Sequence, residues 1–218
     1  MTEKFRDRFD AGRLLAQQLK PNYGQGKNVI VLGLPRGGVP IASEIAKALH
    51  APLDICIVRK LGVPENREVA MGAIASGGIM ILNEDLIQSL NISQPELEEV
   101  IVREWQELER RERLYRGDRS MPNLHNHTVI LVDDGMATGS TLKAALSVIK
   151  QQQPKEIVVA VPVAPPDVCD ELKQEVDAVV CLLTPKYLYS ISLWYTDFSP
   201  TSDRQVRELL AENISQLA

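Results

Sequence analysis

The sequence is short of several residue types, and each shortage excludes a class of protein. Only three cysteines occur in 218 residues, at Cys56, Cys169 and Cys181, and none belongs to a C-x-x-C pair. Neither a disulfide framework nor a zinc site is therefore expected. The three histidines form no evident Ser-His-Asp or Cys-His arrangement. No apolar run approaches the roughly 18 residues that a membrane-spanning helix needs, so we expect no membrane partner.

The chain also has little excess charge of either sign. With 24 basic and 29 acidic residues, its formal net charge is -5. This balance predicts no general attraction to nucleic acid or to an anionic membrane, although a local basic patch stays open. The N-terminal stretch MTEKFRDRFDAGRLLAQQL lacks the apolar core of a signal peptide. These shortages favour a cytoplasmic location and argue against nucleic acid as a partner.

The sequence does contain a series of short apolar runs that are rich in Val and Ile. They span residues 29–34, 53–58, 129–132, 157–163 and 178–183. Because apolar and polar residues do not strictly alternate, the runs are typical of strands buried on both faces of a parallel sheet. Helical spacing is present between them at residues 39–50 and 141–150, and another helix is expected at 6–19. This order predicts an α/β fold with a doubly wound, mostly parallel sheet.

Two segments depart from the alternation of strand and helix. Residues 93–119 are charge-dense and begin with Ser93 and Glu96 in the spacing of a capping box, which predicts a helix start. Their charges favour a solvated helix with internal salt bridges. Arginines near the end of this segment could instead contact a partner subunit or an anionic ligand; they are Arg110, Arg111, Arg113 and Arg116. Residues 62–78 begin polar and end as a short strand-like piece.

The stretch VILVDDGMATGST, residues 129–141, carries the clearest chemical pattern. It places Asp133 and Asp134 at the predicted C-terminal end of a central strand, where open α/β sheets bind ligands. The turn that follows leads into a helix, and the N–H groups at a helix N-terminus attract phosphate. Paired carboxylates can accept hydrogen bonds from two ribose hydroxyls or hold Mg²⁺ through water. The pattern predicts a ribose 5-phosphate site; the alternative is an acidic turn that only caps the helix.

This stretch resembles the phosphoribosyl-pyrophosphate-binding motif of type I phosphoribosyltransferases over the full length of the motif. Members of that family transfer ribose 5-phosphate from phosphoribosyl pyrophosphate to a nitrogen nucleophile, usually of a base, and release pyrophosphate with Mg²⁺ present. The resemblance implies that Asp133 and Asp134 face the ribose hydroxyls. The residues implied to hold the 5-phosphate are Ala137, Thr138, Gly139, Ser140 and Thr141, and Gly135 is implied to bind the donor as well.

One position departs from part of the family. Members that act on 6-oxopurines have an aspartate where this chain has Ala137, and that aspartate assists at the purine N7. Its absence argues against hypoxanthine or guanine as the acceptor. In this respect the chain looks more like the members that use adenine, orotate or uracil.

A second segment that resembles the family is GLPRGGVP, residues 33–40, which follows the first predicted strand and precedes a helix. The resemblance implies that Arg36, Gly37 and Gly38 bind pyrophosphate. The alternative is a simple turn rich in Gly and Pro.

Arg59 and Lys60 come straight after the second apolar run, where two cations would bind pyrophosphate and stabilise its charge as it leaves. With Asp133 and Asp134 they are the candidate catalytic residues. The next residues, GVPENRE, are similar to the family's mobile loop that closes over the donor. Arg67 is the candidate contact of that loop, although it could also be an exposed charge.

The C-terminal part resembles the variable hood with which the family recognises its acceptor. Residues 184–200 concentrate aromatic side chains in a chain with only 5% of them. A flat base would stack on Trp194 or Tyr195, and Asp197 could bond to an N–H of the acceptor. Alternatively, the rings pack the hood onto the sheet. A closing helix is expected at residues 202–216.

The leading hypothesis is a Mg²⁺-dependent phosphoribosyltransferase with an α/β core at residues 1–183 and a small C-terminal hood at 184–218. The stretches LGLPRGGVPIA and WYTDFSPTSDRQV also resemble a bacterial subgroup of the family that has no known acceptor. Two alternatives stay open: a non-catalytic protein that senses the donor and regulates transcription or RNA, and hydrolysis with water as acceptor. A homodimer is common in the family and is expected here. The general base is not identified.

Overall fold

The computed structural model describes residues 4–24 and 28–217, apart from the side chains of Arg67, Glu68 and Leu217. These residues divide into two compact units. The first unit comprises Met1–Cys56, Pro122–Gly139 and Gln153–Ala218, within the described residues. The second comprises Ile57–Met121 and Ser140–Gln152. Each unit has its own sheet.

The sheet of the first unit has five strands, all parallel, in the order β2-β1-β6-β7-β8. The strands are β1 (Val29–Gly33), β2 (Leu53–Ile55), β6 (Thr128–Val132), β7 (Glu156–Val163) and β8 (Ala178–Leu183). Every residue of β1 and β6 is buried, as expected of central strands with both faces covered. The predicted α/β fold with a mostly parallel sheet is confirmed, and β6 is its middle strand.

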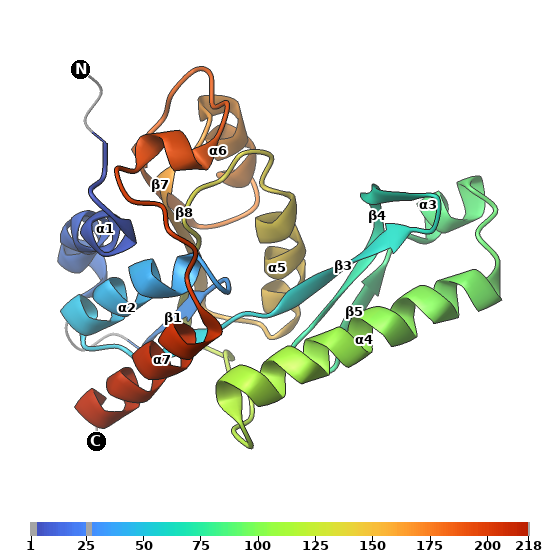
Figure 1. The fold of residues 1–218 in the computed structure, drawn as a ribbon, viewed down its shortest axis with the longest axis horizontal. Helices are drawn as coiled ribbons and strands as arrows, with labels where there is room; N and C mark the ends of the chain where they lie inside the picture. Colours follow the sequence, from blue (N-terminus) through green and yellow to red (C-terminus); the bar gives the residue numbers. More distant parts are fainter. Residues whose placement is uncertain (1–3, 25–27, 218) are drawn as a thin grey trace. The chain divides into compact units, whose positions relative to one another are not determined.

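Helices α1 (Arg8–Tyr23), α2 (Gly38–Leu49), α6 (Pro166–Leu172) and α7 (Asp203–Leu217) belong to the same unit. Figure 1 shows α1 lying beside α2, and these two helices pack closely, with α7 packed on α2 as well. Asp7 caps α1 by accepting a hydrogen bond from the Asp10 N–H at 2.7 Å. The helices predicted at 6–19, 39–50 and 202–216 are therefore present, with α1 four residues longer at its end than expected.

The second unit contains an antiparallel sheet that the sequence did not predict. Its strands are β3 (Val58–Val63), β4 (Asn66–Ala75) and β5 (Ile79–Leu82), in the order β3-β4-β5. Helix α5 (Ser140–Gln151) packs against all three strands, and α4 (Gln94–Arg116) packs against β3 and β4. A short helix, α3 (Glu84–Ser89), follows β5.

The apolar run at residues 53–58 is not one strand, and this prediction was wrong. The parallel strand β2 ends at Ile55, and Val58 already begins β3 in the other sheet. The residues between them change partners: the Cys56 N–H donates to Gly33 O at 3.0 Å, whereas Ile57 O accepts from the Ser76 N–H at 3.2 Å. Apolar composition marks both strands as buried, but it does not show where backbone pairing passes from one sheet to another.

Helix α4 confirms the predicted start and the predicted surface. Ser93 and Glu96 form a capping box, and ion pairs at helical spacing join Glu107 to Arg110 and Arg111, at 2.8 and 2.7 Å. Hydrogen bonds from these two arginines lower the pKa of Glu107 to about 2. The helix is thus largely a solvated one with internal salt bridges. Arg116 is the exception, because it is buried and donates to Ser76 Oγ at 3.0 Å.

Within residues 4–24 and 28–217, no helix is both long enough and apolar enough to cross a bilayer.

Candidate active site

The candidate site begins where the middle strand β6 ends. Asp133 and Asp134 are the first two residues after Val132, and the N–H of Asp134 donates to Asp133 Oδ1 at 2.8 Å. Burial, followed by the charge of Asp134, raises the pKa of Asp133 to about 8. The predicted acidic pair therefore stands at the sheet edge at which α/β proteins bind ligands.

Arg8 holds one carboxylate of this pair. Its Nε and Nη2 atoms both donate to Asp134 Oδ2, at 2.9 and 2.8 Å. The third nitrogen, Nη1, donates to Ser199 O at 2.8 Å. The side chains of Arg8 and Asp134 are only 10% and 16% exposed, so this ion pair is shielded from solvent.

Arg8 was not among the predicted site residues, although the sequence contains a signal for it. Arg8 lies three and seven residues before Ala11 and Leu15, which are buried on the apolar stripe of α1. An arginine on such a stripe needs a partner inside the protein. The sequence could have indicated this need, but not that the partner is a residue 126 positions away.

Aromatic residues of the C-terminal segment enclose the Arg8–Asp134 pair. The Tyr195 hydroxyl donates to Asp134 O at 2.7 Å, and the Arg8 guanidinium carbon lies 3.8 Å from the centre of the Phe198 ring. Tyr195 also packs against Phe5 and Phe198, with ring centres 5.4 and 4.9 Å apart. Burial and the charge of Asp134 raise the pKa of Tyr195.

These contacts favour the packing interpretation for Tyr195 over the stacking of a base. Tyr195 is only 4% exposed. Asp197 is exposed, but its Oδ1 already accepts from the N–H and Oγ of Ser199, at 2.9 and 2.6 Å, and these bonds lower its pKa. Trp194 ends a short 3-10 helix, η1 (Ile191–Trp194), and is half-buried. Of the two aromatic candidates for binding a base, Trp194 therefore keeps the more accessible ring.

The PRGG turn that precedes α2 lies directly on the end of β6. A Cβ on Gly37 would stand 2.0 Å from Asp134 Oδ2, and one on Gly38 would stand 2.5 Å from Val132 O. Only glycine permits this approach. The Pro35–Arg36 peptide bond is cis, and the Arg36 side chain is half-exposed, with Nη1 3.8 Å from Asp203 Oδ1. The structure therefore brings Gly37 and Gly38 against the acidic pair and leaves Arg36 accessible.

The turn after the acidic pair is exposed along most of its length. Four of its residues are exposed: Ala137, Thr138, Ser140 and Thr141. Gly135, by contrast, is buried. Gly139 has a φ of 70°, the left-handed conformation that glycine adopts at little cost. The next residue, Ser140, begins α5, so this turn ends at a helix N-terminus, as the phosphate hypothesis requires.

Arg59 and Lys60 were predicted to follow a parallel strand, and this prediction was wrong. Both residues lie inside β3, in the second unit. The Nε of Arg59 donates to Glu104 Oε2 of α4 at 2.9 Å. Neighbouring side chains of a strand point to opposite faces, and Lys60 has no ion-pair partner in the part of the chain that the structure describes. The turn after β3 is a hairpin to β4, and the side chain of Arg67 in β4 lies outside the described residues.

Two pockets of the first unit lie among the helices that cover its sheet. One, of about 230 Å³, is bordered by Arg8 and by residues of the C-terminal segment that include Asp197 and Thr201. It adjoins the Arg8–Asp134 pair. The other is smaller, about 110 Å³, and contains none of the predicted site residues.

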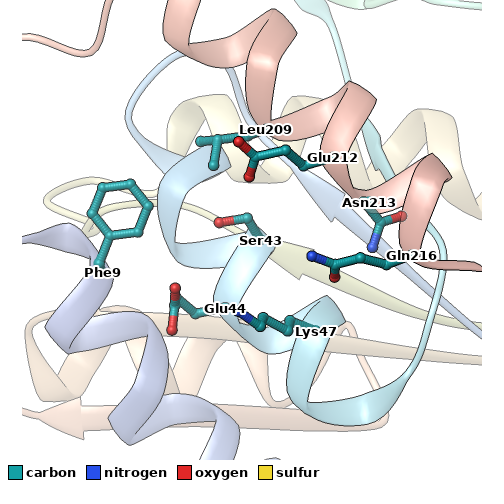
Figure 2. A pocket seen from close by; sticks show the side chains of 8 residues that line it. All are labelled: Phe9, Ser43, Glu44, Lys47, Leu209, Glu212, Asn213 and Gln216. Atoms are coloured by element: carbon teal, nitrogen blue, oxygen red, sulfur yellow. The ribbon is translucent and has the colours of Figure 1, made fainter.

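Figure 2 shows that the smaller pocket is bordered by polar side chains of α2 and α7, with Phe9 of α1 at its side. Several of these polar groups are already engaged. The Asn213 side chain binds the backbone of Leu53 and Ala51, at 2.8 and 3.2 Å, and Glu44 pairs with Arg13 at 3.6 Å. The contacts of Asn213 join α7 to the start of β2, which is a structural role.

Mg²⁺ was predicted at the acidic pair, and Asp133 and Asp134 are the residues that would hold it. Among the described residues, no group of three or more His, Cys, Asp or Glu side chains could hold a metal ion. Mg²⁺ is commonly bound through one or two carboxylates, several waters and the phosphates of a substrate. Asp133 and Asp134 could supply the one or two carboxylates of such a site.

Comparison with known proteins identifies the family of this chain. A family model described as the phosphoribosyl transferase domain matches residues 3–186. The chain therefore belongs to the phosphoribosyl transferase family. It is also 44% identical, over 202 residues, to a Mycobacterium tuberculosis (strain H37Rv) protein named "Putative phosphoribosyl transferase Rv0571c". That match covers 93% of this chain and 45% of the relative, so the chain spans about half the length of the curated relative.

The solved structures that are similar to this chain include proteins from Thermus thermophilus and Aquifex aeolicus. The crystal structure of the protein TT1426 from Thermus thermophilus is 41% identical, with a TM-score of 0.85, over 96% of this chain and 98% of that one. The structure of the AQ2163 protein from Aquifex aeolicus is 12% identical, with a TM-score of 0.53, over 93% and 85% of the two chains. The second likeness shows the fold alone.

Proposed function

We propose that this protein transfers ribose 5-phosphate from phosphoribosyl pyrophosphate to a nitrogenous base or a related nucleophile, with release of pyrophosphate. The proposal rests on one observation, which is the arrangement of residues at the C-terminal end of β6. There, Asp133 and Asp134 stand beside the Gly37–Gly38 turn, and a hydroxyl-bearing turn leads to the start of α5. This arrangement offers carboxylates to a sugar and backbone N–H groups to a phosphate.

The proposed mechanism is mainly electrostatic. Asp133 and Asp134 orient the ribose so that its reactive carbon is held for attack. Arg36, which is half-exposed, neutralises charge on the departing pyrophosphate. When bound with the donor through water or ribose at the acidic pair, Mg²⁺ supplies further positive charge to that leaving group. No residue is assigned as general base.

The acceptor is proposed to be a base other than a 6-oxopurine. Ala137 is exposed and has no group that could bond to a purine N7. Trp194 is the remaining candidate for stacking, because Tyr195 is buried and its hydroxyl is engaged. Adenine, orotate and uracil are the first acceptors to test.

Pyrophosphate release tests the proposed transfer. The protein is incubated with phosphoribosyl pyrophosphate, Mg²⁺ and each base in turn. Release that depends on one base, and that is lost in Asp133→Asn, supports transfer. Release without any base indicates hydrolysis. Donor binding without release across the panel would refute transfer and support the alternative, a non-catalytic protein that senses the donor.

A further inference from the structure

Arg8 binds Asp134 of the candidate site, although it belongs to none of the motifs that resemble the family. We propose that Arg8 is a positioning residue, which fixes the carboxylate of Asp134 so that one oxygen of each aspartate faces the ribose of the donor. This inference rests on the proposed function and assigns a role that neither the DDG stretch nor the PRGG turn supplies.

The guanidinium of Arg8 is anchored independently of Asp134. Its Nη1 donates to Ser199 O at 2.8 Å, and its carbon lies 3.8 Å from the centre of the Phe198 ring, which is a cation–π contact. Arg8 itself is only 9% exposed. Because one end of the guanidinium is fixed by these contacts, the Nε and Nη2 atoms are presented to Asp134 in a set direction.

Both of those atoms reach the same oxygen. The two hydrogen bonds, of 2.9 and 2.8 Å, end on Asp134 Oδ2. Gly37 closes the same side of the carboxylate, since a Cβ there would stand 2.0 Å from Oδ2. Arg8 and the glycine turn thus leave Oδ1 as the oxygen of Asp134 that a ligand can approach.

The neighbouring aspartate has one engaged oxygen as well. Asp133 Oδ1 accepts the N–H of Asp134 at 2.8 Å. Within the described part of the chain, Asp133 Oδ2 and Asp134 Oδ1 have no hydrogen-bond partner. One open oxygen on each of two adjacent residues matches the two vicinal hydroxyls of a ribose, which can each donate one hydrogen bond.

The backbone of Asp134 is also fixed by a hydrogen bond. A shift of the main chain therefore does not move the carboxylate out of place. The Tyr195 hydroxyl donates to Asp134 O at 2.7 Å, from a side chain that is 4% exposed. Without Arg8, the carboxylate could rotate about its side-chain bonds while the backbone stayed in place. The predicted defect is therefore one of sugar recognition and not of pyrophosphate binding.

The test compares two ligands that differ by the ribose phosphate. Affinities for phosphoribosyl pyrophosphate and for inorganic pyrophosphate, each with Mg²⁺, are measured by titration calorimetry for the wild type, Arg8→Gln and Arg8→Lys. Arg8→Gln is expected to bind phosphoribosyl pyrophosphate about tenfold more weakly, the usual size of a lost charge-assisted hydrogen bond, and to bind pyrophosphate unchanged. Arg8→Lys keeps the charge without the planar fork, so it should restore part of the lost affinity.

Arg6→Gln is the matched control, because the Arg6 side chain is 69% exposed and pairs only with Asp7 among the described residues. It should leave both affinities unchanged. Circular dichroism and the thermal midpoint establish that each variant is folded, and if Arg8→Gln does not fold, Arg8→Lys carries the comparison alone.

The outcomes separate this inference from the function on which it rests. Equal weakening of both ligands would show a purely structural role for Arg8 and overturn the inference, and so would unchanged or tighter binding of phosphoribosyl pyrophosphate by Arg8→Gln. If the wild type binds pyrophosphate but no phosphoribosyl pyrophosphate, the proposed function itself fails and the inference falls with it.

Discussion

Asp133 and Asp134 are neighbours in the chain, yet their surroundings differ. Two hydrogen bonds from Arg8 compensate the charge of Asp134. Asp133 has no such cation within hydrogen-bond reach in the described structure, and burial raises its pKa to about 8. At the scale of single residues, the site is therefore asymmetric, because Asp134 is paired with a cation whereas Asp133 is unpaired with one and has a raised pKa. The motif alone gives no sign of this difference.

Replacing Asp134 tests the energy of its buried pairing. Asp134→Asn should lower the unfolding free energy by about 3 kcal/mol, because a buried guanidinium loses its counter-charge. The double variant Arg8→Gln/Asp134→Asn should be more stable than the sum of the two single effects predicts, since it leaves no buried charge unpaired. Urea unfolding of all four proteins measures the coupling. Additive effects would mean that the pair is not shielded from water.

At the scale of elements, helices whose ends have local signals were well predicted. The capping box of α4 lies within four consecutive residues, Ser93 to Glu96, and both of its hydrogen bonds form. The boundary between β2 and β3 has no such signal, because one apolar run continues from β2 into the start of β3. This is why the antiparallel sheet and the place of Arg59 and Lys60 within it were not predicted.

Removing the cap should weaken the start of α4. Ser93→Ala is expected to cost about 1 kcal/mol in the stability of the first turn, which loses a side-chain partner for its N–H groups. Hydrogen exchange of the amides near Leu97 should become faster, while those near Leu108, in the middle of the helix, should change little. Ser89→Ala, which removes a hydroxyl from the end of α3, is the control. Equal exchange rates in Ser93→Ala and the wild type would contradict the prediction.

The two cations of β3 are expected to have separate roles. Arg59 is bound to Glu104 at 2.9 Å, so Arg59→Ala should mainly lower the thermal midpoint. Lys60, which has no such partner among the described residues, should be the one that binds an anion. Lys60→Ala should weaken pyrophosphate binding about tenfold, with Lys155→Ala as a control on a lysine outside β3. The assignment fails if Arg59→Ala weakens pyrophosphate binding more than Lys60→Ala does.

At the scale of the whole molecule, the chain forms two sheets of different kinds in two compact units. The parallel sheet holds the acidic pair and the glycine turn, and the antiparallel sheet holds the predicted cations. The division between the units falls between Gly139 and Ser140. The motif VILVDDGMATGST is therefore continuous in sequence although its residues belong to both units.

The pKa of Asp133 should make the stability of the molecule depend on pH. Between the ordinary value of 3.8 and about 8, the folded state binds a proton at Asp133 that the unfolded state has lost. The unfolding free energy should therefore fall as pH rises through this interval, by at most about 1.4 kcal/mol per pH unit. Asp133→Asn lacks this contribution, so it should match the wild type near pH 4 and exceed it in stability at about pH 8. Urea unfolding at several pH values measures the difference, and a constant difference would contradict the raised pKa.

The sequence by itself determined the parallel sheet, the position of the acidic pair at the end of its middle strand, and the main helices, because each is encoded by neighbouring residues with a fixed period or spacing. Tertiary structure alone decided that Arg8 from the first helix would hold Asp134, that Tyr195 would be buried at the same point, and that Arg59 would pair with Glu104. These contacts join residues 45 to 126 positions apart. A buried charge specifies that it needs a partner, but only the folded backbone determines which partner is within reach.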